Sequence, residues 1–229
     1  MGRRPESEES GDRPAWKTFE GRQTLKSMEP ALAAGFFIGG SVLRFAHRLT
    51  RPALFTALGV GLGFSLTAVP NVELVTATIF LAGFILGPAK GLAVGAATEC
   101  LYSLLNPYGL AAPPLLAAQV LSMAVTGLAG GLFWKKRPLK GRFLPLRLGL
   151  TGFVCTLLFD VLTTLSFIPI NHFTGKQLAA SVALGAWFYV VHLTGNTGIF
   201  SVLLPAVIRR ADALGTADFQ TMRRVEWDS

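Results

Sequence analysis

Long apolar runs separated by short polar connectors dominate the chain from about residue 50 to about residue 210. A transmembrane helix needs about 20 apolar residues to cross roughly 30 Å of hydrocarbon, at about 1.5 Å per residue. The second and third of the runs here are short, so each would span only with help from flanking residues or neighbouring helices. The six nearly uncharged runs are Ala53–Val69, Leu74–Leu86, Gly91–Leu105, Leu115–Trp134, Leu148–Ile168 and Ala180–Ile208. This pattern predicts an all-α integral membrane protein, a six-transmembrane-helix bundle that occupies residues 51–210.

The distribution of Lys and Arg predicts how this bundle is oriented. Short cytoplasmic loops of membrane proteins are enriched in these two residues. If both termini are cytoplasmic, the inner side receives every Lys and Arg between Arg44 and Arg210 except Lys176, which is alone on the outer side. We therefore expect the N- and C-termini in the cytoplasm. The net charge of +8 then reflects membrane anchors, and nucleic acid is not expected as a partner.

Composition is also typical of a protein that has lipid as its solvent. Hydrophobic residues make up 51% of the chain and charged residues 15%, whereas soluble domains carry about 25% charged residues. Residues 1–29 are rich in both charge signs and poor in apolar side chains, so we predict a disordered cytoplasmic tail. The apolar piece that follows ends at Arg44 and is too short to span, which favours an interfacial amphipathic segment over residues 30–50. Residues 211–229 are predicted to be a cytoplasmic C-terminal tail.

Small residues four apart mark the faces on which helices can approach closely in a membrane. One such ladder runs down the first predicted helix through Ala53, Ala57 and Gly61. Because its first two members lie at the cytoplasmic end, beside a basic segment, they suit either packing within the bundle or docking of a partner protein. The other ladders, for which packing within the chain is the simpler interpretation, comprise Gly83, Gly87, Gly91 and Gly95, and Gly127 with Gly131.

Polar side chains recur inside the predicted helices at helical spacing. A carboxylate in the hydrocarbon region costs several kcal/mol unless it is paired, hydrated or neutralised, so Glu99 and Asp160 are functional candidates. Mutual pairing that only fixes helix register is the alternative, and it is the simpler explanation for any single residue such as Asn196. A hydrated pocket explains better why the whole set gathers in the outer half of the bundle. The residues predicted to line a substrate site there are Asn71, Glu73, Glu99, Tyr102, Asn106, Gln119, Asp160, Thr164, Tyr189, His192 and Asn196.

The segment Pro70-Asn71-Val72-Glu73 lies between the first two apolar runs. We expect Pro70 to stop the first helix and Asn71 to make the turn. Glu73 would then fall in the first turn of the second helix, where a carboxylate complements the helix dipole. Helix capping and a place at the rim of the pocket are both open for this residue.

Motifs for several enzymatic and metal-dependent functions are missing from the sequence. It contains no G-x-x-x-x-G-K-[ST] nucleotide-binding loop, no H-E-x-x-H and no G-x-S-x-G. Its histidines, His47, His172 and His192, are too scattered for a metal triad, and Cys100 and Cys155 suit buried, inert thiols. We therefore expect no enzyme, no metal and no cofactor.

The region from residue 51 to 134 resembles the substrate-binding S component of energy-coupling factor (ECF) transporters, which are bacterial micronutrient importers, and the six-helix topology extends the resemblance to about residue 210. The motifs that carry it are Ala53-x-x-x-Ala57, Pro70-Asn71-Val72-Glu73, Thr76-Ala77, Gly83-Phe84-Ile85-Leu86-Gly87-Pro88, and Gly91 with Gly95. The tails before residue 51 and after residue 210 lie outside it.

The resemblance implies a subunit of the bacterial cytoplasmic (inner) membrane that captures a vitamin-like small molecule at an outward-facing site. It implies a transmembrane coupling subunit and two ATPase subunits as partners, with membrane lipid around the bundle and Ala53, Ala57 and Gly61 on the docking face. Two other functions stay open. One is a stand-alone permease or proton-coupled carrier that uses Glu99 and Asp160, and the other is a non-transporting membrane scaffold.

Overall fold

The computed structural model describes residues 49–66, 69, 72–106, 109–135, 142–168 and 174–214. The chain divides into two units, Met1–Arg48 and Leu49–Ser229, and the described residues belong to the second. The predicted N-terminal tail, nearly all of the predicted interfacial segment and residues 215–229 therefore lie outside the described residues. The same holds for Asn71. Residues 211–214, which were assigned to the C-terminal tail, continue the last helix.

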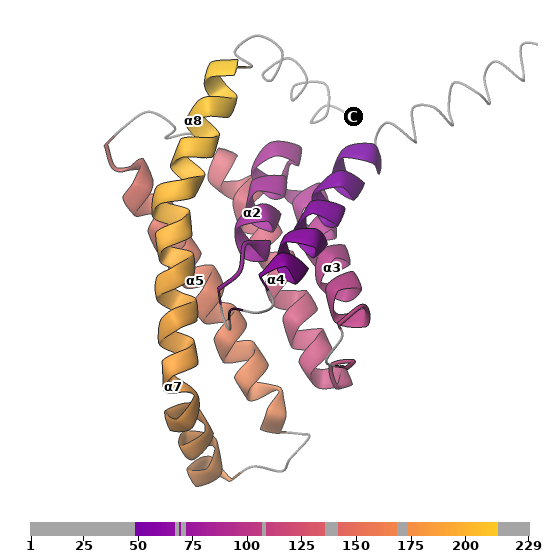
Figure 1. The fold of residues 1–229 in the computed structure, drawn as a ribbon, viewed down its shortest axis with the longest axis vertical. Helices are drawn as coiled ribbons and strands as arrows, with labels where there is room; N and C mark the ends of the chain where they lie inside the picture. Colours follow the sequence, from indigo (N-terminus) through magenta and orange to yellow (C-terminus); the bar gives the residue numbers. More distant parts are fainter. Residues whose placement is uncertain are drawn as a thin grey trace, which may run out of the picture. The chain divides into compact units, whose positions relative to one another are not determined.

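Helices make up the described part of the chain, which contains no strand (Figure 1). The first helix covers residues 49–65. The others are α2 (Val75–Leu86), α3 (Pro88–Leu104), α4 (Pro113–Lys135), α5 (Leu144–Leu165), α7 (Gly175–Gly198), η2 (Ile199–Leu203) and α8 (Leu204–Leu214). The predicted all-α fold class is thus confirmed for these residues, and each predicted apolar run contains or overlaps one of these helical segments.

Prolines begin three of these helices earlier than the apolar runs predicted. A proline fits the first turn of a helix, because the N–H that it lacks has no partner there and its φ is already helical. Pro88 starts α3, Pro113 starts α4, and Pro145 lies in the first turn of α5. The additional turn of α5 contains Arg147, whose side chain is exposed. The helix can therefore begin at Leu144 without burying this charge.

The first helix ends earlier than expected. It stops at residue 65, and Leu66 accepts a hydrogen bond from the Val69 N–H at 2.9 Å, which closes a turn. Pro70 therefore does not end this helix, because the chain has already left the helical path several residues before it. The connection to α2 is a turned segment and not a continuation of the first helix.

Glycines bring α2, α3 and α4 into backbone contact. A Cβ atom added at Gly83 or Gly91 would collide with the Gly127 carbonyl, and one added at Gly131 would collide with Pro88. A Cβ atom at Gly95 would meet the Met123 backbone. The predicted glycine ladders on these helices are therefore packing faces within the chain, as small residues permit in membranes.

A second region of the core joins α2 to α5, η2 and α8. Phe80 is fully buried, and its ring lies edge-on to the ring of Phe200 with centroids 5.1 Å apart. Leu144 and Leu148 of α5 pack in the same cluster as Leu204 of α8. These contacts set α5 and the α7–η2–α8 run against α2.

Helix α7 continues without a break through η2 into α8. The five residues of η2 form a wide π turn in which Phe200 is fully buried. In Figure 1, α5 runs beside α7. Asn196, near the middle of the continuous α7–η2–α8 run, contacts Glu73 two residues before α2.

Three of the described helices are long and apolar enough to cross a membrane: Pro113–Phe133, Leu144–Leu165 and Gly175–Arg210. Helix α2 is apolar but shorter. A multi-pass membrane protein is consistent with these lengths. The number of six spans and the cytoplasmic position of both termini stay predictions.

Candidate functional site

Glu73 connects the segment before α2 to the C-terminal part of α7. Its Oε2 accepts a hydrogen bond from the Thr76 N–H at 2.8 Å, which satisfies a free donor of the first turn of α2. Its Oε1 accepts a hydrogen bond from Nδ2 of Asn196 at 3.0 Å. Glu73 precedes the first turn instead of lying within it, and its bond to Thr76 is a capping contact. Its place at the rim of a pocket stays a prediction.

His192 continues this network toward α5. Its Nε2 lies 3.7 Å from Oε1 of Glu73, and its Nδ1 lies 2.7 Å from Oδ1 of Asp160. The second contact is a hydrogen bond between the imidazole and the Asp160 carboxyl group. Two carboxylates, one imidazole and one amide from three elements therefore form a continuous network, which we call the polar cluster: Glu73, Asp160, His192 and Asn196.

The polar cluster is buried but incompletely satisfied. Asn196 is 2% exposed and Asp160 is 8% exposed. Within the described residues, Oδ2 of Asp160, Oδ1 of Asn196 and the hydroxyl of the nearby Thr156 have no hydrogen-bond partner. Buried polar groups normally have partners, so each of these atoms needs an explanation, and a bound molecule is one.

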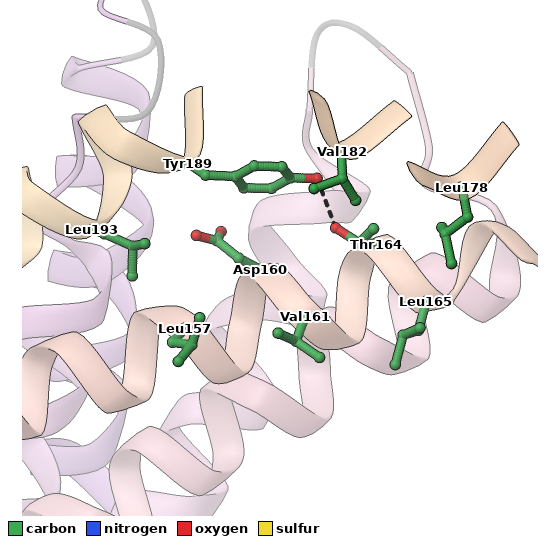
Figure 2. Close-up of a pocket in the computed structure, with 9 residues that line it drawn as sticks. All are labelled: Leu157, Asp160, Val161, Thr164, Leu165, Leu178, Val182, Tyr189 and Leu193. Carbon is green, nitrogen blue, oxygen red and sulfur yellow. Dashed lines mark hydrogen bonds between the residues drawn. The ribbon is translucent and has the colours of Figure 1, made fainter. Parts of the chain in front are cut away.

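An open cavity of about 340 Å³ adjoins the polar cluster between α5 and α7, and four of the side chains that line it, Leu157, Val161, Leu165 and Val182, are exposed. Its polar lining residues are Asp160, Thr164 and Tyr189 (Figure 2). The hydroxyl groups of Thr164 and Tyr189 are hydrogen-bonded to each other at 2.8 Å. The apolar lining residues are Leu157, Val161, Leu165, Leu178, Val182 and Leu193.

This cavity combines apolar walls with a few polar groups, which is typical of small-molecule sites. The volume lies at the lower end of the usual range of about 300–1,000 Å³ for such sites. Its apolar walls were not among the predicted site residues, because leucine and valine in a membrane helix carry no signal in the sequence that separates a pocket wall from a lipid-facing surface.

Glu99 lies in a second group of polar residues, between α3 and α4. Glu99 is buried, and the Ser103 hydroxyl donates toward its Oε1 at 3.3 Å. The same hydroxyl lies 3.5 Å from Oε1 of Gln119 on α4. Glu99 interacts electrostatically with Glu73, which relates this group to the polar cluster. Sequence reasoning missed Ser103, although its position four residues after Glu99 places it on the same helix face.

Two other predicted site residues, Tyr102 and Asn106, lie outside the lining of the cavity. Tyr102 is half-buried and packs against Phe64 of the first helix, with ring centroids 5.0 Å apart. Asn106 follows the end of α3, where its carbonyl accepts a hydrogen bond from the Gly109 N–H at 3.1 Å. Whether any of the predicted residues contacts a substrate stays a prediction.

The predicted docking residues lie on an open face of the first helix. Ala53, Ala57 and Gly61 are all exposed. A Cβ atom added at Gly61 would meet nothing within 4 Å. This ladder therefore differs from those of α2, α3 and α4, which are occupied by contacts within the chain.

No group of three or more His, Cys, Asp and Glu side chains suited to a metal ion occurs among the described residues. Cys155 is buried and Cys100 is half-buried, and both are free thiols. Within this part of the chain, the arrangement is suited to binding through hydrogen bonds and apolar contact.

The comparisons with known proteins agree with the helical architecture. The family model described as "ECF transporter, substrate-specific component" matches residues 47–209, which include the whole polar cluster and the cavity. No curated protein and no solved structure matched the chain. Because the family model covers well over half of the sequence, the chain belongs to the family of substrate-specific components of ECF transporters.

Proposed function

We propose that the protein captures a vitamin-like small molecule in the outer half of its helix bundle and delivers it through an ATP-driven importer of the bacterial cytoplasmic membrane. The binding site comprises the polar cluster and the adjoining cavity between α5 and α7. Membership of the family makes the chain a substrate-specific subunit of ECF transport, and it implies association with a coupling subunit and ATPases.

The observation that carries this proposal is the arrangement around Asp160. One carboxylate oxygen is bonded to His192, the other has no partner among the described residues, and the residue lines a cavity of small-molecule size. Helix packing alone gives no reason to combine a buried carboxylate, a spare acceptor and a cavity, because an ionisable group in a membrane costs several kcal/mol.

Glu73 ties the segment before α2 to the proposed site. Its Oε1 accepts a hydrogen bond from Nδ2 of Asn196 on α7. In this proposal a ligand that replaces this contact releases Glu73 from Asn196, so ligand capture is linked to the contact between α7 and the segment before α2.

Energy for transport comes from partner subunits in this proposal. The sequence contains no P-loop for ATP, and the exposed face formed by Ala53, Ala57 and Gly61 offers a close-packing surface to a transmembrane coupling subunit.

Mass spectrometry of small molecules that stay bound through gentle detergent purification tests the site. We expect a vitamin-like molecule with the native protein and a large loss of it with Asp160→Leu or Glu99→Leu. Leu184→Ala is the matched control, because Leu184 is 85% exposed on α7 and is not among the residues that line the cavity. Unchanged retention in both acidic variants would contradict the proposed site.

A proton-coupled carrier is the second candidate, and the contact of His192 with both Glu73 and Asp160 favours it, because an imidazole between two carboxylates can pass a proton. Uptake by such a carrier stops when the proton gradient is collapsed. Uptake through an ECF transporter stops instead when an ATPase partner is removed.

A further inference from the structure

The ionisable groups around the cavity between α5 and α7 restrict the charge that a ligand there can carry. Around it, the acidic groups are Asp160 at the wall, Glu73 beyond His192, and Glu99 in electrostatic contact with Glu73. The single basic group within this set is the His192 imidazole. Even a protonated His192 leaves a surplus of carboxylates over cations.

No Lys or Arg is among the described residues that line this cavity. Between residues 148 and 208 the one Lys or Arg is Lys176, which is exposed in the first turn of α7. Between residues 52 and 134 the one such residue is Lys90, which lies in the first turn of α3, at the opposite end of that helix from Asn106. An anionic ligand would therefore enter a buried region that repels it, which is costly in a low-dielectric interior.

The unpartnered acceptor at the cavity is Oδ2 of Asp160, which has no partner among the described residues, and Asp160 is 8% exposed. Thr164 and Tyr189 bond each other, and whichever hydroxyl accepts keeps one O–H donor. Figure 2 shows the Asp160 carboxylate rising from α5 between Leu193 and the Tyr189 ring. A ligand that places a charged N–H donor here satisfies the free oxygen and lies beside an aromatic ring, which also attracts cations.

The walls exclude a bare metal ion as the ligand. Metal ions such as Ca²⁺ need several converging oxygen ligands, but the cavity has one carboxylate and is otherwise lined mostly by leucine and valine side chains. Those walls suit the carbon skeleton of an organic molecule, and the volume of about 340 Å³ suits a small one.

We infer that the substrate is a small organic cation, with an apolar or aromatic body held between α5 and α7 and a protonated nitrogen paired with Asp160. This inference rests on the proposed function, because it assigns a chemical class to the ligand of the same site.

Three compounds of equal size and different charge test the inference: 1-naphthylmethylamine, 1-naphthylmethanol and 1-naphthoic acid. Each is titrated into the full chain in lipid nanodiscs, with binding followed by calorimetry. A charged hydrogen bond contributes about 1.5–3 kcal/mol, so we expect the amine to bind at least about tenfold more tightly than the alcohol. The acid should show no binding.

Two variants locate the origin of this preference. Asp160→Asn keeps the size of the side chain and removes its charge, so the amine and the alcohol should bind it about equally. Tyr189→Phe removes a hydroxyl but keeps the ring, so the preference for the amine should remain.

Equal binding of all three compounds, tighter binding of the acid or the alcohol, or binding of none by the native protein would each overturn the cation assignment. So would a preference for the amine that survives in Asp160→Asn. None of these outcomes affects the mass-spectrometric test of the proposed function, which fails only if Asp160→Leu and Glu99→Leu retain the native small molecule. The two ideas are therefore tested separately.

Discussion

Nδ1 of His192 lies 2.7 Å from Oδ1 of Asp160, and this contact joins α7 to α5 inside the helix bundle. The same imidazole faces Glu73 through its other nitrogen. His192 therefore separates two carboxylates that would otherwise confront each other in a buried region. Its removal should affect stability as well as binding.

We expect His192→Leu to lower the stability of the folded protein by roughly 3–5 kcal/mol, because breaking a buried pair leaves a buried charge without its partner. Thermal unfolding in detergent measures the loss. The double variant His192→Leu with Asp160→Leu should recover part of it, since the stranded carboxylate is then gone as well. Strictly additive losses in the two single variants and the double variant would show that the contact contributes no coupling.

Gly83→Ala should destabilise the fold by about 1–3 kcal/mol, which is the usual cost of forcing extra atoms into a packed interior. A Cβ atom at this position collides with the Gly127 carbonyl, and backbone cannot move aside as a flexible side chain can. Gly61→Ala is the matched control. It introduces the same methyl group into a helix where nothing lies within 4 Å, so it should be neutral or stabilise by up to about 1 kcal/mol. Equal unfolding temperatures for the two variants would argue against tight packing of α2 on α4.

Ala53→Trp combined with Ala57→Trp should abolish assembly with the coupling subunit and leave ligand binding intact. The two alanines are exposed on the first helix, so bulky side chains there block a partner without disturbing the described core. Co-purification of the coupling subunit measures assembly. Leu184→Trp adds a comparable bulk to an exposed position on α7 and should assemble normally. Retained co-purification of the double tryptophan variant would refute the docking face.

A cysteine introduced at position 142 should react with a membrane-impermeant maleimide only in opened cells, and a cysteine at position 174 should react in intact cells. Arg142 follows the basic connector that we predict to be cytoplasmic, and Thr174 precedes α7 on the predicted outer side. The background is Cys100→Ala with Cys155→Ala, since these two are the native thiols. Labelling of position 142 in intact cells would invert the bundle and contradict a site in its outer half.

The helices were predictable because an apolar run long enough to span a membrane has few alternatives to a helix. Their ends were less predictable, as Pro88 and Leu144 show, because capping and proline geometry act beyond the apolar run. Spacing placed His192 and Asn196 on one face of their helix. It could not show that Glu73 would reach that face, because this depends on where the turn before α2 meets α7. The cavity escaped prediction for a similar reason, since it arises from two packed helices and not from the periodicity of either one.

The π turn at Ile199–Leu203 explains how one long helix keeps the buried residues of α7 and those of α8 on the same face. Buried residues recur every four positions along it, from His192 through Asn196, Phe200 and Leu204 to Ile208. In a regular α-helix with 3.6 residues per turn, a step of four residues drifts steadily around the axis. A π turn takes up an additional residue and so resets the phase. The polar residues His192 and Asn196 and the apolar residues Leu204 and Ile208 are thereby kept on one face of the helix, so deleting a single residue from this turn would rotate one pair out of alignment with the other.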